Sequence, residues 1–140
     1  MRLLIVNGPN LNLIGQREEE IYGNRSFEQY FKTLQSENEG NLEYVQSNVE
    51  GELINFLQSS NHDGIILNAG GYTHTSVALR YCVKAIGVPV VEVHISNITA
   101  REEFRHTSLI SPVAIGCIFG LGLESYGLAV AYFENYLKNR

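Results

Sequence analysis

Short apolar runs alternate along this chain with segments whose apolar residues recur at helical spacing. Largely apolar runs occupy residues 3–6, 64–67, 88–95 and 113–119, and residues 42–47 alternate between apolar and polar side chains. Continuous apolar runs of this length are typical of strands buried on both faces, whereas an alternating run is typical of a sheet edge. Strands that alternate with helices predict a parallel sheet covered by helices on both faces.

The segments between these runs predict helices with recognisable starts. Ser26 and Gln29 form the Ser-x-x-Gln pattern of a capping box. Asn48 is a candidate cap for the second helix, and Thr73 or Thr75 is a candidate cap for the third. The predicted helices cover residues 26–40, 48–57, 73–86, 100–105 and 126–137.

The order of these elements is five repeats of strand and helix, which predicts one domain over residues 1–140. Hydrophobic residues make up 44% of the chain and charged residues 18%, a composition that supports a folded core. The predicted architecture is an α/β flavodoxin-like three-layer sandwich, with a five-stranded parallel sheet of strand order 2-1-3-4-5. Residues 11–25 show no clean period and predict a long mobile loop.

Charge and cysteine usage indicate the cellular setting. The formal net charge of −5 disfavours a general nucleic-acid binder, which usually presents a basic face. Cys82 and Cys117 lie in apolar runs without Cys-x-x-Cys spacing, so both are expected to be buried, reduced thiols. No apolar run approaches the roughly 20 residues that a membrane-spanning helix needs. We therefore expect a cytoplasmic protein that binds neither nucleic acid nor membranes.

Polar residues lie at the ends of three predicted strands. Asn7 and Asn10 follow the first strand, residues 68–74 follow the third, and Glu92 and His94 belong to the fourth. In open α/β sheets, ligands bind beyond the carboxyl ends of the strands, where the strand order changes direction. We therefore expect these groups to converge on one site.

Glu92 and His94 are two residues apart on one predicted strand, so their side chains point to the same face of the sheet. A carboxylate in an apolar strand is unfavourable unless it is paired. A Glu–His pair at a strand end suits general acid–base chemistry, with the glutamate orienting the imidazole. A buried structural pair would show the same pattern.

Arg17 and Tyr22 lie in the long loop. A free tyrosine has a pKa of about 10, and a guanidinium close to the phenolate would lower that pKa toward the range of a general base. Taken alone, the pair favours the simpler interpretation of a packed tyrosine ring and a solvated arginine.

Several other residues are candidates for ligand binding. Gly70 permits a close backbone approach, and His74 is either a ligand contact or a surface residue at a helix start. Ser96 lies at the start of a predicted short helix, where backbone N–H groups could bind a carboxylate. Arg101 and Arg105 are four residues apart and are predicted to share one face, either toward the ligand or as a solvated charged surface.

Two other kinds of site receive little support. His62, His74, His94 and His106 lack the spacing of metal ligands, so no metal site is predicted. The Gly120–Gly122 segment lacks the full G-x-G-x-x-G spacing, so a nucleotide-binding signalling domain is supported only by the predicted fold.

Four motifs follow one another along nearly the whole chain, namely Asn7–Asn12 with Leu13–Arg17 and Ile21–Gly23, Asn68–Arg80, Val91–Asn97 with Ala100–Arg105, and Gly120–Gly122. Taken together in this order, they resemble type II 3-dehydroquinate dehydratase. The resemblance implies a lyase of the shikimate pathway that converts 3-dehydroquinate to 3-dehydroshikimate without a cofactor or metal. It also implies a homo-oligomer, a dodecamer of four trimers.

The resemblance implies an anti elimination that passes through an enolate. Tyr22, as a phenolate beside Arg17, would remove the proton alpha to the ketone, and Asn10 would help to hold the water that stabilises the enolate. His94 would protonate the departing hydroxyl, and Glu92 would order the site.

A second set of residues is implied to bind the substrate. An asparagine, a histidine and an arginine would bind ring hydroxyls, and two successive backbone N–H groups would hold the substrate carboxylate. The loop at about residues 15–25 would close over the site as a lid. The set consists of Asn68, Gly70, His74, Ile95, Ser96 and Arg105.

The sequence departs from the family pattern at three positions. Glu19 stands where proline is common, and Thr99 stands where histidine is common. Tyr81 replaces an aspartate that reaches into a neighbouring subunit's site in the family. These departures leave a second hypothesis open, a non-catalytic flavodoxin-like binding module for a small polyhydroxy acid.

Overall fold

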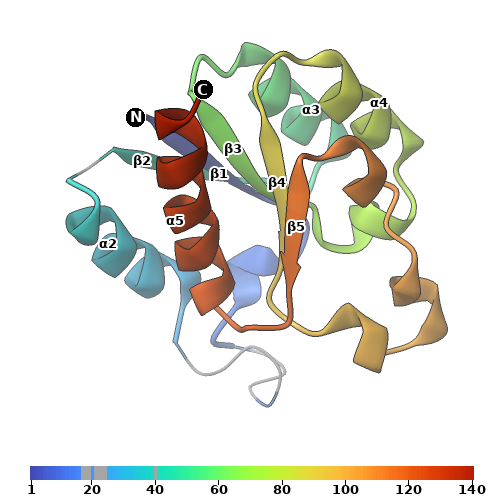
Figure 1. Ribbon diagram of the computed structural model, residues 1–140. Coiled ribbons are helices and arrows are strands. Elements are labelled where there is room, and N and C mark those ends of the chain that lie inside the picture. The colour runs from blue at the N-terminus through green and yellow to red at the C-terminus, as the bar shows by residue number, and fades with distance from the viewer. Residues whose placement is uncertain (17–19, 21–24, 40) are drawn as a thin grey trace.

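A five-stranded parallel sheet forms the centre of the protein in the computed structural model, which describes residues 1–16, 20, 25–39 and 41–140. The strand order is β2-β1-β3-β4-β5, as predicted (Figure 1). Every residue of β1, β3 and β4 is buried, in agreement with their apolar sequences, whereas β2 and β5 lie at the edges. The strands are Leu3–Asn7 (β1), Leu42–Gln46 (β2), Gly64–Asn68 (β3), Val90–His94 (β4) and Gly116–Phe119 (β5).

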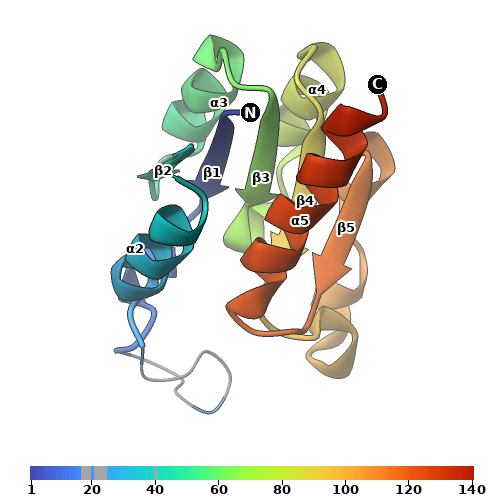
Figure 2. The same ribbon diagram turned by 60° about the vertical axis from the view of Figure 1, so that its left-hand side comes forward.

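Helices cover both faces of the sheet. Helices α2 (Phe27–Glu37) and α5 (Glu124–Lys138) lie on one face, and α3 (Glu50–Ser59) and α4 (Val77–Ala85) lie on the other (Figures 1 and 2). Each pair contributes its apolar side to a separate core cluster against the sheet. The three-layer flavodoxin-like prediction is therefore confirmed.

The capping box that begins α2 is present. The Gln29 backbone N–H donates to Ser26 Oγ at 3.1 Å, and the Ser26 N–H donates to Gln29 Oε1 at 3.1 Å. The predicted caps of the next two helices are wrong. Val49, not Asn48, is the residue before α3, and Ser76 caps α4 by accepting the N–H of Leu79 at 2.9 Å.

The structure explains why these caps differ from the prediction. Asn48 Oδ1 accepts the backbone N–H of Asn10 at 3.0 Å, so this side chain supports another loop instead of its own helix. Residues Gly70–His74 form a separate 3-10 turn (η2), and α4 begins only after it. Tertiary contacts therefore override the local capping pattern at both helices.

The region between β4 and β5 is less regular than predicted. The single helix expected at 100–105 is replaced by two 3-10 turns, Ile98–Ala100 (η3) and Glu103–His106 (η4). A third turn, Ser111–Val113 (η5), includes the first residue of the strand predicted at 113–119. The observed strand is therefore shorter than predicted and covers only β5. The prediction that both cysteines are buried is wrong for Cys117, which is exposed because β5 lies at the sheet edge.

Gly15 and the Arg25–Ser26 peptide, which precedes α2, lie next to each other in the fold. Gly15 has φ +92°, and a Cβ atom built on it would lie 3.1 Å from the carbonyl carbon of Arg25 and 3.1 Å from the nitrogen of Ser26. A glycine fits this contact, since a side chain would be strained there. Arg17 and Tyr22, which the sequence predicts in the lid, lie outside the described residues.

Candidate active site

A polar cavity of about 170 Å³ lies beyond the carboxyl ends of β1, β3 and β4. This is where the strand order predicts a ligand site. A larger cavity of about 600 Å³ lies between α2 and α5, but none of the predicted site residues lines it. We therefore take the smaller cavity as the candidate site. Its lining consists of Pro9, Asn10, Leu11, Asn68, Gly70, Gly71, His74, His94, Ile95, Ser96, Ile98, Arg101 and Arg105.

Most of the predicted site residues therefore converge. Eight of them line the cavity, and the ninth described one, Glu92, lies directly behind His94. The eight are Asn10, Asn68, Gly70, His74, His94, Ile95, Ser96 and Arg105.

Asn68 is held rigidly at the end of β3. Its Nδ2 donates to the hydroxyl of Tyr126 at 2.9 Å, and its Oδ1 accepts the N–H of Gly70 at 3.1 Å. The Tyr126 hydroxyl donates in turn to Oδ1 of Asn7 at 2.8 Å, and Asn7 pairs with Asn68 in the sheet register. Burial raises the pKa of the Tyr126 phenol, so it remains a neutral donor. Sequence reasoning assigned Tyr126 only to the core face of the last helix.

The turn that carries Asn10 packs tightly against the end of β3. Asn10 has φ 68°, a left-handed conformation that asparagine tolerates better than most residues. A Cβ atom at Gly8 would lie 2.4 Å from the Ala69 carbonyl oxygen, and one at Gly70 would lie 3.1 Å from the Pro9 carbonyl oxygen. These close approaches, with the hydrogen bond from Asn10 to Asn48, fix the turn at the cavity wall.

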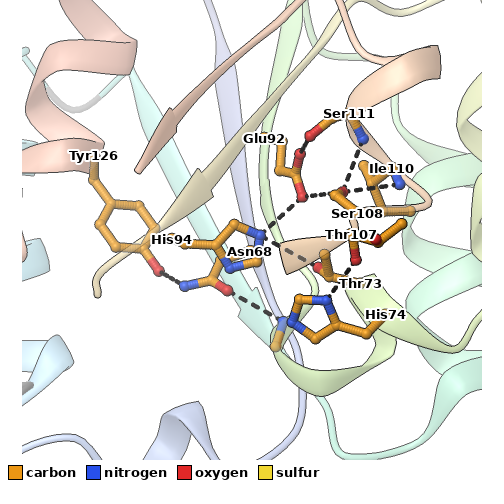
Figure 3. Close-up of polar contacts among 11 residues, drawn as sticks. Asn68, Thr73, His74, Glu92, His94, Thr107, Ser108, Ile110, Ser111 and Tyr126 are labelled. Atoms are coloured by element: carbon orange, nitrogen blue, oxygen red, sulfur yellow. Dashed lines mark hydrogen bonds and ion pairs between the residues drawn. The ribbon is translucent and has the colours of Figure 1, made fainter. Parts of the chain in front are cut away.

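Glu92 and His94 form the buried pair that the sequence predicts (Figure 3). His94 Nε2 lies 2.8 Å from Glu92 Oε2, and Glu92 is 0% exposed. Ser108 Oγ donates to the same carboxylate oxygen at 2.7 Å, and Ser111 Oγ donates to Oε1. Sequence reasoning missed both serines, since their link to Glu92 exists only in the folded chain.

These partners decide the charge of Glu92. Burial by itself would raise the pKa of the carboxyl. The hydrogen bond and charge of His94, with the two serine hydroxyls, outweigh burial and hold that pKa below its ordinary value. Glu92 is therefore a carboxylate near neutral pH, and it can stabilise a protonated His94 at the cavity wall.

His74 also has a fixed orientation. Its Nδ1 lies 2.8 Å from the carbonyl oxygen of Thr107, which can only accept, so Nδ1 carries the hydrogen (Figure 3). The His74 ring stacks near the His94 ring, with centroids 6.3 Å apart. Nε2 of His74 is consequently the ring nitrogen left to contact a ligand.

Two arginines give the cavity a cationic side. Arg105 donates from Nε to Glu102 Oε2 at 2.9 Å, and Arg101 Nη1 donates to Ser96 Oγ at 3.2 Å. The prediction that both share one helix face is wrong, because they belong to different parts of an irregular segment, yet both line the cavity. The sequence offers both arginines as candidates for ligand binding, but the family resemblance implies a role for Arg105 alone. The cationic side suits an anionic ligand group.

Comparisons with known proteins assign the family. A family model described as dehydroquinase class II matches residues 1–134. The chain belongs to this family. A 3-dehydroquinate dehydratase of Fusobacterium nucleatum is 52% identical over 144 residues, which cover 97% of this chain and 98% of the relative. One from Prochlorococcus marinus is 50% identical over 143 residues, which cover 99% of each protein.

Solved structures agree with this family assignment. The crystal structure of a type II dehydroquinase from Butyrivibrio crossotus has a TM-score of 0.90 and 41% identity, covering 96% of this chain and 97% of that chain. One from Propionibacterium acnes has a TM-score of 0.89 and 34% identity, covering 94% of each chain. The resemblance and the enzyme class predicted from the motifs are thus confirmed.

Two of the positions that depart from the family pattern are described. Tyr81 lies on α4 and is 65% exposed, so it is available to a neighbouring molecule. Thr99 donates both its N–H and its hydroxyl to Asn97 Oδ1, at 3.2 Å and 2.7 Å, and so stabilises η3.

Among the described residues, no helix is long and apolar enough to cross a membrane. Within the same part of the chain, no three His, Cys, Asp or Glu side chains gather in a way that could hold a metal ion.

Proposed function

We propose that the protein, as a single catalytic domain of residues 1–140, dehydrates 3-dehydroquinate to 3-dehydroshikimate in the shikimate pathway. The observation that carries the proposal is the buried Glu92–His94 pair at the wall of a polar cavity, in a chain of the class II dehydroquinase family. The reaction is an anti elimination through an enolate. It moves a proton and a hydroxyl without a change of redox state, so the proposal includes no cofactor.

The first step removes the proton alpha to the ketone. Tyr22, as a phenolate beside Arg17, takes this proton, and the C–H electrons form the enolate. Its support is the sequence motif, because both residues lie outside the described part of the chain. Asn10 lies at the cavity wall, where it would help to hold a water against the enolate oxygen.

The second step expels the hydroxyl. His94 gives a proton to the departing oxygen, which leaves as water, while the enolate electrons form the conjugated double bond and restore the ketone. Glu92 supports this role because its buried carboxylate stabilises the imidazolium before transfer and orients the ring. The loop at about residues 15–25 would exclude water while both steps proceed.

Substrate binding is assigned to the rest of the cavity lining. Arg105, the second amide hydrogen of Asn68 and Nε2 of His74 would bind ring hydroxyls. The backbone N–H groups of Ile95 and Ser96 would hold the carboxylate. Gly70, at φ +61°, lets the turn approach the ring closely.

We also propose that the protein works in the cytoplasm as a homo-oligomer, a dodecamer of four trimers. Support for self-association comes from large apolar side chains that the isolated chain leaves exposed. Four of them lie on or next to β5 and α5, namely Ile115, Leu121, Leu128 and Tyr132. The two free cysteines fit a reducing compartment.

The decisive experiment follows the conjugated-enone absorbance after 3-dehydroquinate is added to metal-free protein. The expected result is a rising enone signal, and its absence with folded protein would refute the activity. A ligand-induced thermal shift without enone formation would favour the binding-module hypothesis.

The Tyr22→Phe variant tests the assigned base. Turnover should fall by several orders of magnitude, because phenylalanine has no group that can accept the proton. Ligand binding, measured by calorimetry, should remain largely intact. Turnover at the wild-type rate would show that another residue is the base.

A further inference from the structure

Two serines outside the cavity converge on the carboxylate of Glu92. Ser108 and Ser111, called here the serine pair, lie in and beside η5, far from β4 in sequence. Neither serine lines the cavity. Ser108 donates to Oε2 and Ser111 donates to Oε1, so the pair contacts both carboxylate oxygens (Figure 3).

The direction of the Ser108 hydrogen bond is fixed by its other partners. Ser108 Oγ accepts the backbone N–H of Ile110 at 3.1 Å and that of Ser111 at 2.9 Å. With two donors already on the oxygen, the single hydroxyl hydrogen is left for Glu92 Oε2, at 2.7 Å. Ser108 is therefore a preset donor, not a freely rotating hydroxyl.

A proton on Glu92 Oε2 would compete with the preset hydroxyl hydrogen of Ser108. The two serines donate, and His94 donates from Nε2 when it is protonated. The carboxyl is 0% exposed, so water does not offer an alternative acceptor at its surface. The arrangement therefore favours the ionised form of Glu92, and the exchangeable proton of the pair resides on the imidazole.

We propose that the serine pair consists of positioning residues that keep Glu92 ionised and thereby keep the transferable proton on His94. The inference rests on the proposed function, because it assigns a purpose to the acid in that reaction. The same segment also holds the binding side of the cavity, since Thr107 accepts from His74 and the N–H of Leu109 donates to the Thr73 carbonyl oxygen at 2.8 Å.

Other titratable and charged groups around the Glu92–His94 pair remain the same when the serines are changed. His74, Arg101 and Arg105 line the same cavity as His94. Arg80 reaches the same segment from α4 by donating to the Leu109 carbonyl oxygen at 3.2 Å, and Cys117 pairs with Glu92 in the register of β4 and β5. A titration change confined to the serine variants therefore reports the serine hydroxyls.

The test compares Ser111→Ala and Ser108→Ala with the wild type by NMR titration. The Glu92 side-chain carboxyl is followed by ¹³C and the His94 ring by ¹⁵N. Each substitution should raise the midpoint of the Glu92 titration by about one pH unit. The reason is that losing one hydrogen bond to the carboxylate lowers the ionisation constant of Glu92 by about tenfold. Below the new midpoint Glu92 is protonated, so the charged pair persists over a narrower range of pH.

Steady-state kinetics give an independent readout. The kcat of the alanine variants should fall by about tenfold on the acid side of its pH profile and change little near neutral pH, because a midpoint raised by about one unit still leaves Glu92 ionised there. KM for 3-dehydroquinate should change little, since the serine pair does not line the cavity. Ser108→Thr keeps the hydroxyl and should restore both the midpoint and kcat.

Ser60→Ala is the matched control. Ser60 Oγ lies 2.9 Å from His62 Nδ1 and accepts the His62 backbone N–H at 3.2 Å, so it is also a serine beside a titratable group. It precedes β3, at the opposite end of the sheet from the cavity. Its substitution should leave the Glu92 midpoint and kcat unchanged.

The two measurements distinguish a failure of the role proposed for the serine pair from a failure of the proposed reaction. An unchanged Glu92 midpoint in folded Ser111→Ala would overturn the inference, even if kcat falls, because the serine would then act only on the fold. Ser111→Ala keeps the turn that Ser108 closes, so it remains informative if Ser108→Ala does not fold. A shifted midpoint in a protein that never forms enone would support the serine pair and refute the proposed reaction instead.

Discussion

Replacing Tyr126 by phenylalanine removes one oxygen atom and leaves two buried amide groups without their partner. Asn68 Nδ2 loses its acceptor and Asn7 Oδ1 loses its donor, and these residues are 2% and 0% exposed. Each buried group left unpaired costs about 1–3 kcal/mol, and the hydroxyl itself no longer needs to be buried. The expected loss in unfolding free energy is about 2–4 kcal/mol, which corresponds to a melting temperature lower by roughly 10 °C.

The same substitution should also weaken substrate binding. Asn68 keeps its hydrogen bond to Gly70 but loses the one that fixes its nitrogen, so its side chain no longer points reliably into the cavity. KM for 3-dehydroquinate should rise by about tenfold, the effect of losing one well-oriented hydrogen bond. Urea unfolding and the enone assay measure the two consequences separately.

Tyr30→Phe provides the control for this prediction. The Tyr30 hydroxyl accepts the N–H of Gly127 at 3.1 Å, and the residue is 4% exposed, but it does not line the cavity. This variant should lose stability without a change in KM. Equal kinetic effects in both variants would refute the positioning of Asn68 by Tyr126, and an unchanged stability of Tyr126→Phe would refute the hydrogen-bond reasoning itself.

Two further predictions concern pH and assembly. Glu92 has a lowered pKa in the folded state, so its contribution to stability is present above its unfolded pKa of about 4.3 and is lost as pH falls through the folded value. Glu92→Gln should therefore show a smaller fall in unfolding free energy on acidification, and an identical slope in urea titrations at several pH values would contradict this. Sedimentation velocity should give a particle twelve times the 15.7 kDa chain, and a monomer at micromolar concentration would refute the dodecamer.

The sheet and most of the cavity could be predicted because they follow from local patterns of apolar and polar residues along the chain. Continuous apolar runs specify buried central strands, and parallel strands bring their carboxyl ends to one edge. That geometry is sufficient to gather Asn10, Asn68 and His94, which are far apart in the chain. Strand spacing likewise places Glu92 and His94 on one face.

The supporting contacts could not be predicted because they depend on tertiary packing. Ser111 and Ser108 meet Glu92 only after the irregular segment between β4 and β5 folds against the sheet. Asn48 has the sequence signature of a helix cap, yet it is used to hold Asn10. Tyr126 follows the periodicity of a core residue on α5, but the partners of its hydroxyl, Asn7 and Asn68, lie on β1 and β3.

The contact between Gly15 and the Arg25–Ser26 peptide has a consequence for protein engineering. Gly15 and the Arg25–Ser26 peptide lie at almost the same place on the framework, so the sequence between them is a candidate for exchange as one segment. A change in the length of this segment should alter stability little, since doubling the number of residues in a loop adds only about 0.6 kcal/mol to the entropic cost of closing it. Segments from relatives could thus be grafted between Gly15 and Ser26 to alter the proposed base, while the proton donor and its supports on β4 remain untouched.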